Sequence, residues 1–139
     1  MRVLLDTNVL VDVLTRRQPF SENSARVWAL AEAAQVEGFV SALTLPNLFY
    51  LLRKSEGKII ARRAVRTVRD VFQLVPLDEQ IVHQALDAEI VDFEDAVQFF
   101  SALRARAAVL ITRNTKDFPA TDVAVQTPEE FLATHFPAE

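Results

Sequence analysis

The sequence predicts an α/β domain in which a mainly parallel sheet of about five strands is flanked by helices. Two observations favour this class: the strand candidates are short apolar runs, and segments with helical periodicity separate them. The third is size, because 139 residues, half of them apolar, suffice for one hydrophobic core. We therefore expect a single domain spanning residues 1–139.

The expected elements follow from these patterns in chain order. Strands are predicted at residues 3–5, 39–40, 72–75, 109–112 and 123–125. Helices are predicted at residues 24–35, 45–54, 59–70, 79–89 and 94–106. In the first of these, Val27, Leu30 and Ala31 share one face. A last helix is predicted after Thr127, with Pro128 at its first position and Glu130 closing a capping box.

Composition excludes several classes of function. The chain has no cysteine, which excludes disulfides and thiolate metal sites, and only two histidines, which disfavours zinc. Two glycines are too few for a glycine-rich phosphate loop. No apolar run approaches about 18 residues, so we expect a cytoplasmic protein with no membrane partner.

Polar side chains follow two of the predicted strands. Asp6 ends the first strand, while Asn114 and Asp117 follow the fourth. Ligands of open α/β sheets bind beyond the carboxyl ends of the strands. If both strands are central, these residues share one rim of the sheet.

Two further acids, Asp92 and Asp95, stand at the start of a predicted helix. Several carboxylates brought together repel one another, and a divalent cation with oxygen ligands, such as Mg²⁺ or Mn²⁺, removes that conflict. Each acid also has a purely structural interpretation. Asp6 and Asp117 could be turn or cap residues, Asp92 an N-cap, and Asp95 a complement to the helix dipole.

The stretches LLDTNVL and DFEDAVQFFSALRARAAVLITRNTKDF, in this order, resemble the PIN-domain nucleases and most closely the VapC-type toxins of toxin–antitoxin pairs. The resemblance implies a three-layer PIN-like sandwich and Mg²⁺- or Mn²⁺-dependent endoribonuclease activity on an RNA substrate. It also implies an antitoxin protein partner and a homodimer. The implied metal ligands are Asp6, Asp95, Asn114 and Asp117, of which Asp6, Asp95 and Asp117 are also implied as catalytic, and Asp92 is a further candidate ligand one turn before Asp95.

Three other residues would support these ligands. Asn8 and Thr112 are expected to hold the acids in place. Asn47 stands where the family usually has a glutamate, and no acid lies between Gly38 and Glu56. An asparagine offers a carbonyl oxygen but no charge and no general base. Either Asp92 supplies the missing charge, or the chain is a catalytically weak or inactive PIN-fold protein that binds RNA or a protein partner.

The chain has a net charge of −4, yet residues 53–69 hold seven basic residues and one acid. Lys58, Arg62 and Arg66 share one face of the predicted helix, with Arg63 beside it. This face could contact an RNA backbone, dock an acidic partner peptide, or simply be solvated. The aromatic residues of 48–52 are expected in the core, and any exposed part of 45–54 would be a candidate dimer or antitoxin surface.

Overall fold

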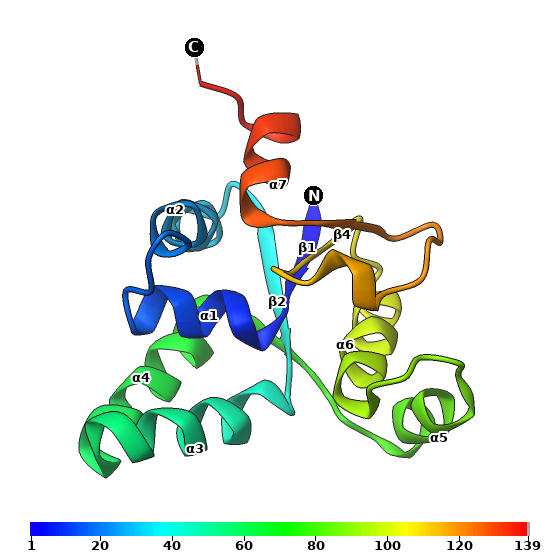
Figure 1. The fold of residues 1–139 in the computed structure, drawn as a ribbon, viewed down its shortest axis with the longest axis horizontal. Helices are drawn as coiled ribbons and strands as arrows, with labels where there is room; N and C mark the ends of the chain where they lie inside the picture. Colours follow the sequence, from blue (N-terminus) through cyan, green and yellow to red (C-terminus); the bar gives the residue numbers. More distant parts are fainter. Residues whose placement is uncertain (139) are drawn as a thin grey trace.

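A computed structural model describes residues 1–138, which form a three-layer α/β domain (Figure 1). Its centre is a five-stranded, all-parallel sheet with strand order β3-β2-β1-β4-β5. The strands are β1 (Arg2–Leu5), β2 (Glu37–Ser41), β3 (Gln73–Val75), β4 (Val109–Ile111) and β5 (Ala124–Gln126). The predicted sheet of about five parallel strands is therefore confirmed.

The first strand lies in the middle of the sheet, between β2 and β4. Leu4 is in register with Phe39 on one side and with Leu110 on the other. The chain builds outward from β1 through β2 to β3, and later from β4 to β5 on the opposite side. The strand order thus changes direction between β1 and β4. Such a switch point leaves a crevice beyond the carboxyl ends of the two strands.

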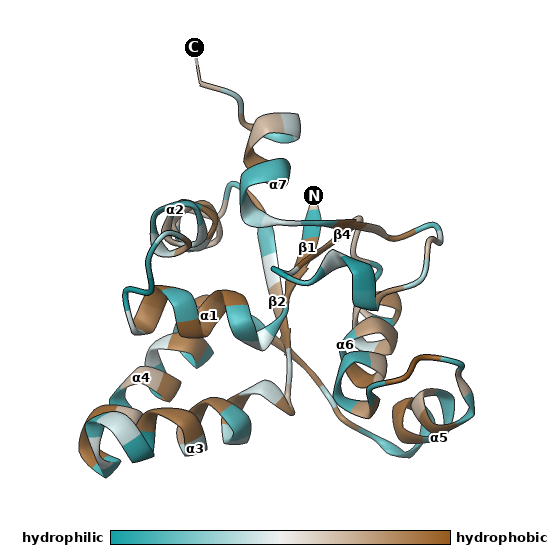
Figure 2. Cartoon of the chain, in the orientation of Figure 1, coloured by the Kyte–Doolittle hydropathy of each residue, from teal (hydrophilic) through white to brown (hydrophobic). Residues whose placement is uncertain are grey.

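Helices cover both faces of the sheet. One face carries α1 (Thr7–Leu14), α2 (Ser21–Glu32), α3 (Thr44–Glu56), α4 (Lys58–Val71) and α7 (Pro128–His135), and the other carries α5 (Glu79–Asp87) and α6 (Phe93–Arg104). Alternation along β1 explains the two layers, because Val3 and Leu5 pack into the first core and Leu4 into the second. Figure 2 shows apolar strands at the centre, whereas the helices alternate between polar and apolar residues.

Two helix predictions need correction. Helix α1 was not predicted, because its eight residues directly follow a strand and are too apolar to show a helical face. The helix predicted at 24–35 is α2, which begins at Ser21 and ends at Glu32. Ser24 resembles a start signal, but it is a fully buried position inside the helix. The chain leaves the helix early, since Ala34 has a positive φ of 58°.

The two glycines sit where side chains would not fit or where the backbone requires them. A Cβ on Gly38 would lie 2.7 Å from the ring of Phe72 and 2.9 Å from Ala31, so glycine lets α2 approach β2. Gly57 has φ 88° and separates α3 from α4. The predicted capping box of α7 is present, with Thr127 and Glu130 bonded reciprocally. Within residues 1–138, every helix is too short or too polar to cross a bilayer.

Candidate active site

Asp6 lies at the carboxyl end of the central strand and begins α1 as its N-cap. Its carboxylate accepts a hydrogen bond from the Thr7 backbone N–H at 2.7 Å. The residue is only 4% exposed, which is unusual for an ionisable group. A cap needs no such burial, because most N-cap carboxylates stay in water. The burial indicates that the group has a task beyond starting the helix.

A small polar network fixes the Asp6 carboxylate. The hydroxyl of buried Thr112, just after β4, donates to Asp6 Oδ2 at 2.9 Å. The Asn8 amide approaches Asp6 Oδ2 at 3.4 Å and Thr112 Oγ1 at 3.2 Å, and its oxygen accepts from the Arg113 backbone N–H. These bonds tie the ends of β1 and β4 together. Asn8 and Thr112 therefore both contact the Asp6 carboxylate, and Asn8 also lines the pocket.

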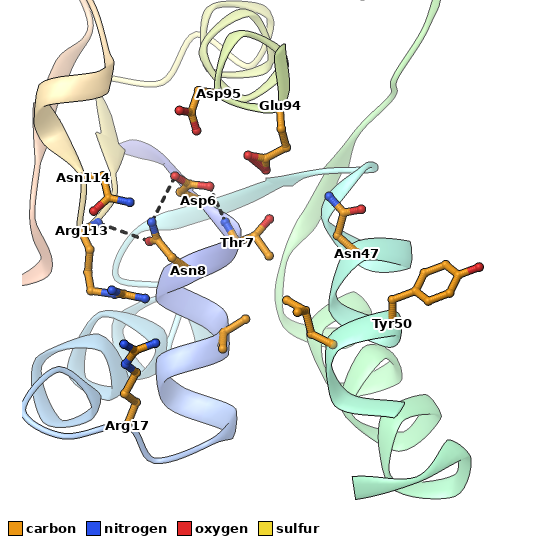
Figure 3. A pocket seen from close by; sticks show the side chains of 12 residues that line it. Asp6, Thr7, Asn8, Arg17, Asn47, Tyr50, Glu94, Asp95, Arg113 and Asn114 are labelled. Atoms are coloured by element: carbon orange, nitrogen blue, oxygen red, sulfur yellow. Dashed lines mark hydrogen bonds between the residues drawn. The ribbon is translucent and has the colours of Figure 1, made fainter. Parts of the chain in front are cut away.

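The N-terminal turn of α6 brings three more carboxylates to the same rim. Asp92 is the N-cap and accepts from the Asp95 backbone N–H at 2.9 Å. Oxygens of Asp92, Glu94 and Asp95 lie within 4.8 Å of one another. Figure 3 shows Glu94 and Asp95 pointing from α6 toward Asp6. The structural role expected for Asp92 is thus present, and it leaves a second carboxylate oxygen free of that bond.

Crowding and burial shift the titration of the two central acids. The pKa of Asp6 is raised to about 7, chiefly by burial and next by the charge of Glu94, while the Thr112 hydrogen bond opposes both. Burial also raises the pKa of Asp95 to about 6, with Asp92, Glu94 and Asp117 adding repulsion. These acids resist joint ionisation, as the sequence analysis anticipates.

The carboxylates line two adjoining hollows. A pocket of about 660 Å³ holds Asp6, Asn8, Asn47, Glu94, Asp95 and Asn114 among its lining residues. A second hollow of about 480 Å³ is lined by Asp92, Asp95, Lys116 and Asp117. Asp95 borders both. Asp117 ends the short 3₁₀ turn Thr115–Asp117 and is exposed, whereas Asn114 faces the first pocket and its N–H bonds Thr112.

Asn47 faces the pocket from α3, on the side where Glu94 approaches from α6 (Figure 3). Glu94 is held there by Gln98, whose amide donates to Glu94 Oε1 at 3.1 Å and to Thr44 Oγ1 at 3.0 Å. Gln98 is fully buried. Glu94 is thus a positioned carboxylate beside the residue that lacks one. Among the acids of α6, Glu94 acts most strongly on the pKa of Asp6.

The side chains present suit a hard divalent cation. The donor set around Asp6 consists of carboxylate and amide oxygens, which Mg²⁺ and Mn²⁺ prefer over nitrogen or sulfur ligands. Burial and, after it, repulsion between the acids raise the pKa values of Asp6 and Asp95, and a cation would offset both effects. Asp6, Glu94 and Asp95 could hold such an ion directly.

The predicted basic face forms as expected on α4. Lys58, Arg62, Arg63 and Arg66 are exposed and line one shallow hollow. Arg62 also stacks over the ring of Phe49, 5.7 Å from its centroid. A neighbouring hollow, lined by Arg62, Arg66 and Tyr50, meets the acidic pocket at Tyr50. A continuous surface therefore connects the basic helix with the carboxylates.

Sequence reasoning missed the three charged pocket residues Glu94, Arg17 and Arg113. Glu94 is adjacent to Asp95, and the helical register at the start of α6 alone did not reveal that both acids face β1. Arg17 follows the unpredicted helix α1, so its position had no basis in the pattern. Arg113 stands between Thr112 and Asn114, and its proximity to α1 depends on the pairing of β1 with β4.

A family model described as PIN domain matches residues 2–116. The chain therefore belongs to the PIN-domain family. It is similar to Ribonuclease VapC1 of Aquifex aeolicus, with 27% identity over 135 residues, covering 94% of this chain and 92% of the relative.

Solved structures show the same fold in toxin–antitoxin proteins. A toxin–antitoxin complex from Klebsiella pneumoniae is similar with a TM-score of 0.68 and 28% identity, covering 91% of this chain and 97% of the other. VapBC2 from Rickettsia felis, bound to a promoter DNA fragment, gives a TM-score of 0.70 at 17% identity, covering 91% and 98%. The expected PIN-like fold and the likeness to VapC-type toxins are both confirmed.

Proposed function

We propose that this protein is the toxin of a toxin–antitoxin pair, an endoribonuclease that hydrolyses RNA phosphodiester bonds with Mg²⁺ or Mn²⁺. The observation that carries the proposal is the meeting of buried Asp6 with Glu94 and Asp95 at the switch point of the sheet. Membership of the PIN family and the similarity to a VapC ribonuclease support the same activity.

In this proposal Asp6, Glu94 and Asp95 hold the catalytic cation, and Asp92, Asn114 and Asp117 complete the polar rim. When bound, Mg²⁺ or Mn²⁺ supplies Lewis acidity, which activates water and offsets the charge on the phosphate oxygens. Thr112 and Asn8 keep the Asp6 carboxylate in one orientation throughout. Gln98 does the same for Glu94. Because both acids are already positioned, little reorganisation is needed when charge develops.

Partners are proposed from the exposed surface. Four apolar side chains are exposed on two successive helices: Tyr50 (61%) and Leu51 (52%) in the middle of α3, and Ile59 (78%) and Ile60 (47%) in the first turn of α4. Exposed apolar groups of this size favour contact with another protein. An antitoxin or a second copy of the chain would cover them, consistent with the expected homodimer. RNA would approach along the basic face of α4, which borders the same region.

A second candidate is a PIN-fold protein that binds RNA or a partner but cleaves weakly. The specific observation in its favour is Asn47, which faces the pocket without a charge. Glu94 argues against it by placing a carboxylate on that side of the pocket. Cleavage separates the two candidates, because both expect a folded protein that binds nucleic acid.

The first experiment is a calorimetric titration of Mn²⁺ into the wild-type protein and into the Asp6→Asn and Asp95→Asn variants. We expect the wild type to bind Mn²⁺, and we expect each variant to bind it about tenfold to a hundredfold more weakly. Circular dichroism should show that both variants remain folded, and cleavage of a mixed RNA pool should disappear in each. Retained metal-dependent cleavage in Asp95→Asn would overturn the assignment.

A further inference from the structure

The pocket has a second wall of opposite charge. Arg17 and Arg113 line it beside Asn8 and across from the acids of α6 (Figure 3). A strand of RNA that enters this pocket meets several carboxylates, and these repel its phosphates. A positive wall at the same place offsets that repulsion. The mechanism above gives neither arginine a role.

Arg113 is anchored by a fully buried acid. Its Nε lies 2.6 Å from Oδ2 of Asp12, which has no exposed side-chain surface. Asp12 projects from α1, the helix that Asp6 begins. Burial of a carboxylate carries a desolvation penalty, which a well-placed partner of opposite charge offsets. Because Asp12 is buried and cannot move into water, its ion pair fixes the position of the Arg113 guanidinium.

Two more contacts set the orientation of Arg113. Its guanidinium carbon lies 4.8 Å from the centroid of the Phe20 ring. Its backbone N–H donates to Asn8 Oδ1 at 3.3 Å, which links it to the residue that holds Asp6. The ion pair with Asp12 is made through Nε, and within residues 1–138 neither terminal nitrogen of Arg113 donates a hydrogen bond. A planar guanidinium held in place by an acid and a ring is prepared to bind an oxyanion with two hydrogen bonds.

Arg17 adds a second cation to the same place. Its backbone N–H bonds the carbonyl of Asp12 at 3.0 Å, and its carbonyl accepts from Ser21 at 2.7 Å, so the turn after α1 is well fixed. Burial raises the pKa of Asp12, and the charges of Arg113 and, more weakly, Arg17 oppose that rise. Arg113 pairs with the Asp12 carboxylate and Arg17 does not, so the two arginines and Asp12 together carry one positive charge in excess. In residues 1–138, the Arg17 side chain makes no ion pair.

We propose that Arg17 and Arg113 form a binding subsite for one phosphodiester of the RNA strand, next to the phosphate that is cleaved. The subsite rests on the proposed ribonuclease function, and it makes Arg17 and Arg113 binding residues that place the strand against the acids. A single negative charge with two free oxygens matches the excess charge and the donors of Arg113. RNA is favoured over an acidic peptide because Arg17 and Arg113 line the same pocket as the carboxylates that are proposed to hold the catalytic cation.

The test measures RNA binding in EDTA, so that it depends on neither a bound metal nor cleavage. The probe is a fluorescein-labelled, single-stranded RNA oligonucleotide of mixed sequence, titrated at several salt concentrations. Arg17→Ala should weaken binding roughly tenfold at low salt and lower the log–log salt slope by about one. Arg26→Ala, which removes an exposed arginine on α2, is the matched control and should leave both quantities unchanged.

Arg113 needs a gentler change, because truncation would leave Asp12 buried and unpaired. Arg113→Lys keeps the charge and loses the planar fork, so it should remain folded and also weaken RNA binding. If both arginines hold one phosphate, the double variant should lose clearly less affinity than the sum of the two single losses. Affinity and salt slope equal to those of Arg26→Ala would overturn the subsite, as would additive losses. An acidic peptide that loses affinity in these variants while RNA does not would also overturn it.

These results remain separate from the fate of the proposed activity. If RNA binding in EDTA depends on Arg17 and Arg113 but no metal-dependent cleavage is found, the subsite stands and the nuclease assignment fails. If cleavage is found and both variants bind RNA normally, the nuclease stands and the subsite fails.

Discussion

The two charged regions of this domain are built in opposite ways. Asp6 at the end of β1 is buried, Glu94 and Asp95 at the start of α6 are half-buried, and the pKa values of Asp6 and Asp95 are raised. The basic residues of α4 are exposed, and in residues 1–138 four of them, Lys58, Arg62, Arg63 and Arg66, form no ion pair. An exposed charge has little effect on the free energy of folding, whereas a buried charge needs a partner or a cation to offset its desolvation.

The two regions differ in how firmly their charged groups are held. The acidic pocket has fixed geometry, because Thr112, Asn8 and Gln98 hold the carboxylates. The basic helix offers only a potential, spread over long side chains. Chemistry requires fixed geometry, and attraction of a polyanion does not. Changes in the pocket should therefore have large and specific effects, and changes on α4 should have small and salt-dependent ones.

The largest expected effect tests whether Glu94 carries the charge that Asn47 lacks. Glu94→Gln should lower Mn²⁺ affinity and RNA cleavage by about tenfold to a hundredfold, with the fold unchanged. Adding Asn47→Glu to Glu94→Gln should restore much of both, because the carboxylate then enters from α3 on the same side of the pocket. Calorimetry and a cleavage assay measure the two quantities.

Asp87→Asn is the control for that comparison, since it removes an exposed acid at the end of α5, away from the pocket-lining residues. It should behave like the wild type. A Glu94→Gln protein with wild-type metal affinity would show that the pocket does not need this carboxylate.

A smaller effect is the pH dependence of stability in metal-free protein. The pKa of Asp6 is raised to about 7 in the folded state, against 3.8 for the ordinary group. The folded state therefore binds more protons than the unfolded state between these values, so stability falls as pH rises from about 4 to 7. The raised pKa of Asp95, about 6, acts in the same direction. Melting temperatures measured across this range in EDTA would show the decline.

Asp6→Asn removes this penalty and supplies the control. Its melting temperature should rise relative to that of the wild type as pH increases from 4 to 7, and the gap should then stay constant. Adding Mn²⁺ should stabilise the wild type most at high pH, where binding displaces the fewest protons. A wild-type protein whose advantage over Asp6→Asn grows with pH would contradict the raised pKa.

The smallest effect concerns α4. Arg62→Ala and Arg66→Ala should each weaken RNA binding severalfold at low salt and very little at high salt, and each should lower the salt slope by about one. Fluorescence anisotropy at several salt concentrations measures this. If the variants and the wild type bind RNA with equal affinity at every salt concentration, the basic face of α4 is solvated or serves a protein partner.

Much of the fold was predictable because local patterns determine it. The apolar runs of β1 and β4, the helical periodicity of α3 to α6 and the capping box at Thr127 all appear where the sequence indicates. The acids Asp6 and Asp95 could be selected because they follow a strand or begin a helix. Helix α1 could not be predicted, because its short apolar sequence fits a strand equally well.

Local sequence patterns predict the α/β sheet, the elements that carry the acids, and a cation that would reconcile their charges. Which side chains meet depends on the tertiary structure. The pairing of β1 with β4 brings Asp6 to Thr112 and Arg113 over more than 100 residues of chain. The packing of α6 turns Glu94 toward Asp6 and Asn47. Local sequence sets the conformation of each element. Their arrangement depends on the free energy of burying both faces of the sheet, and that free energy involves the whole chain.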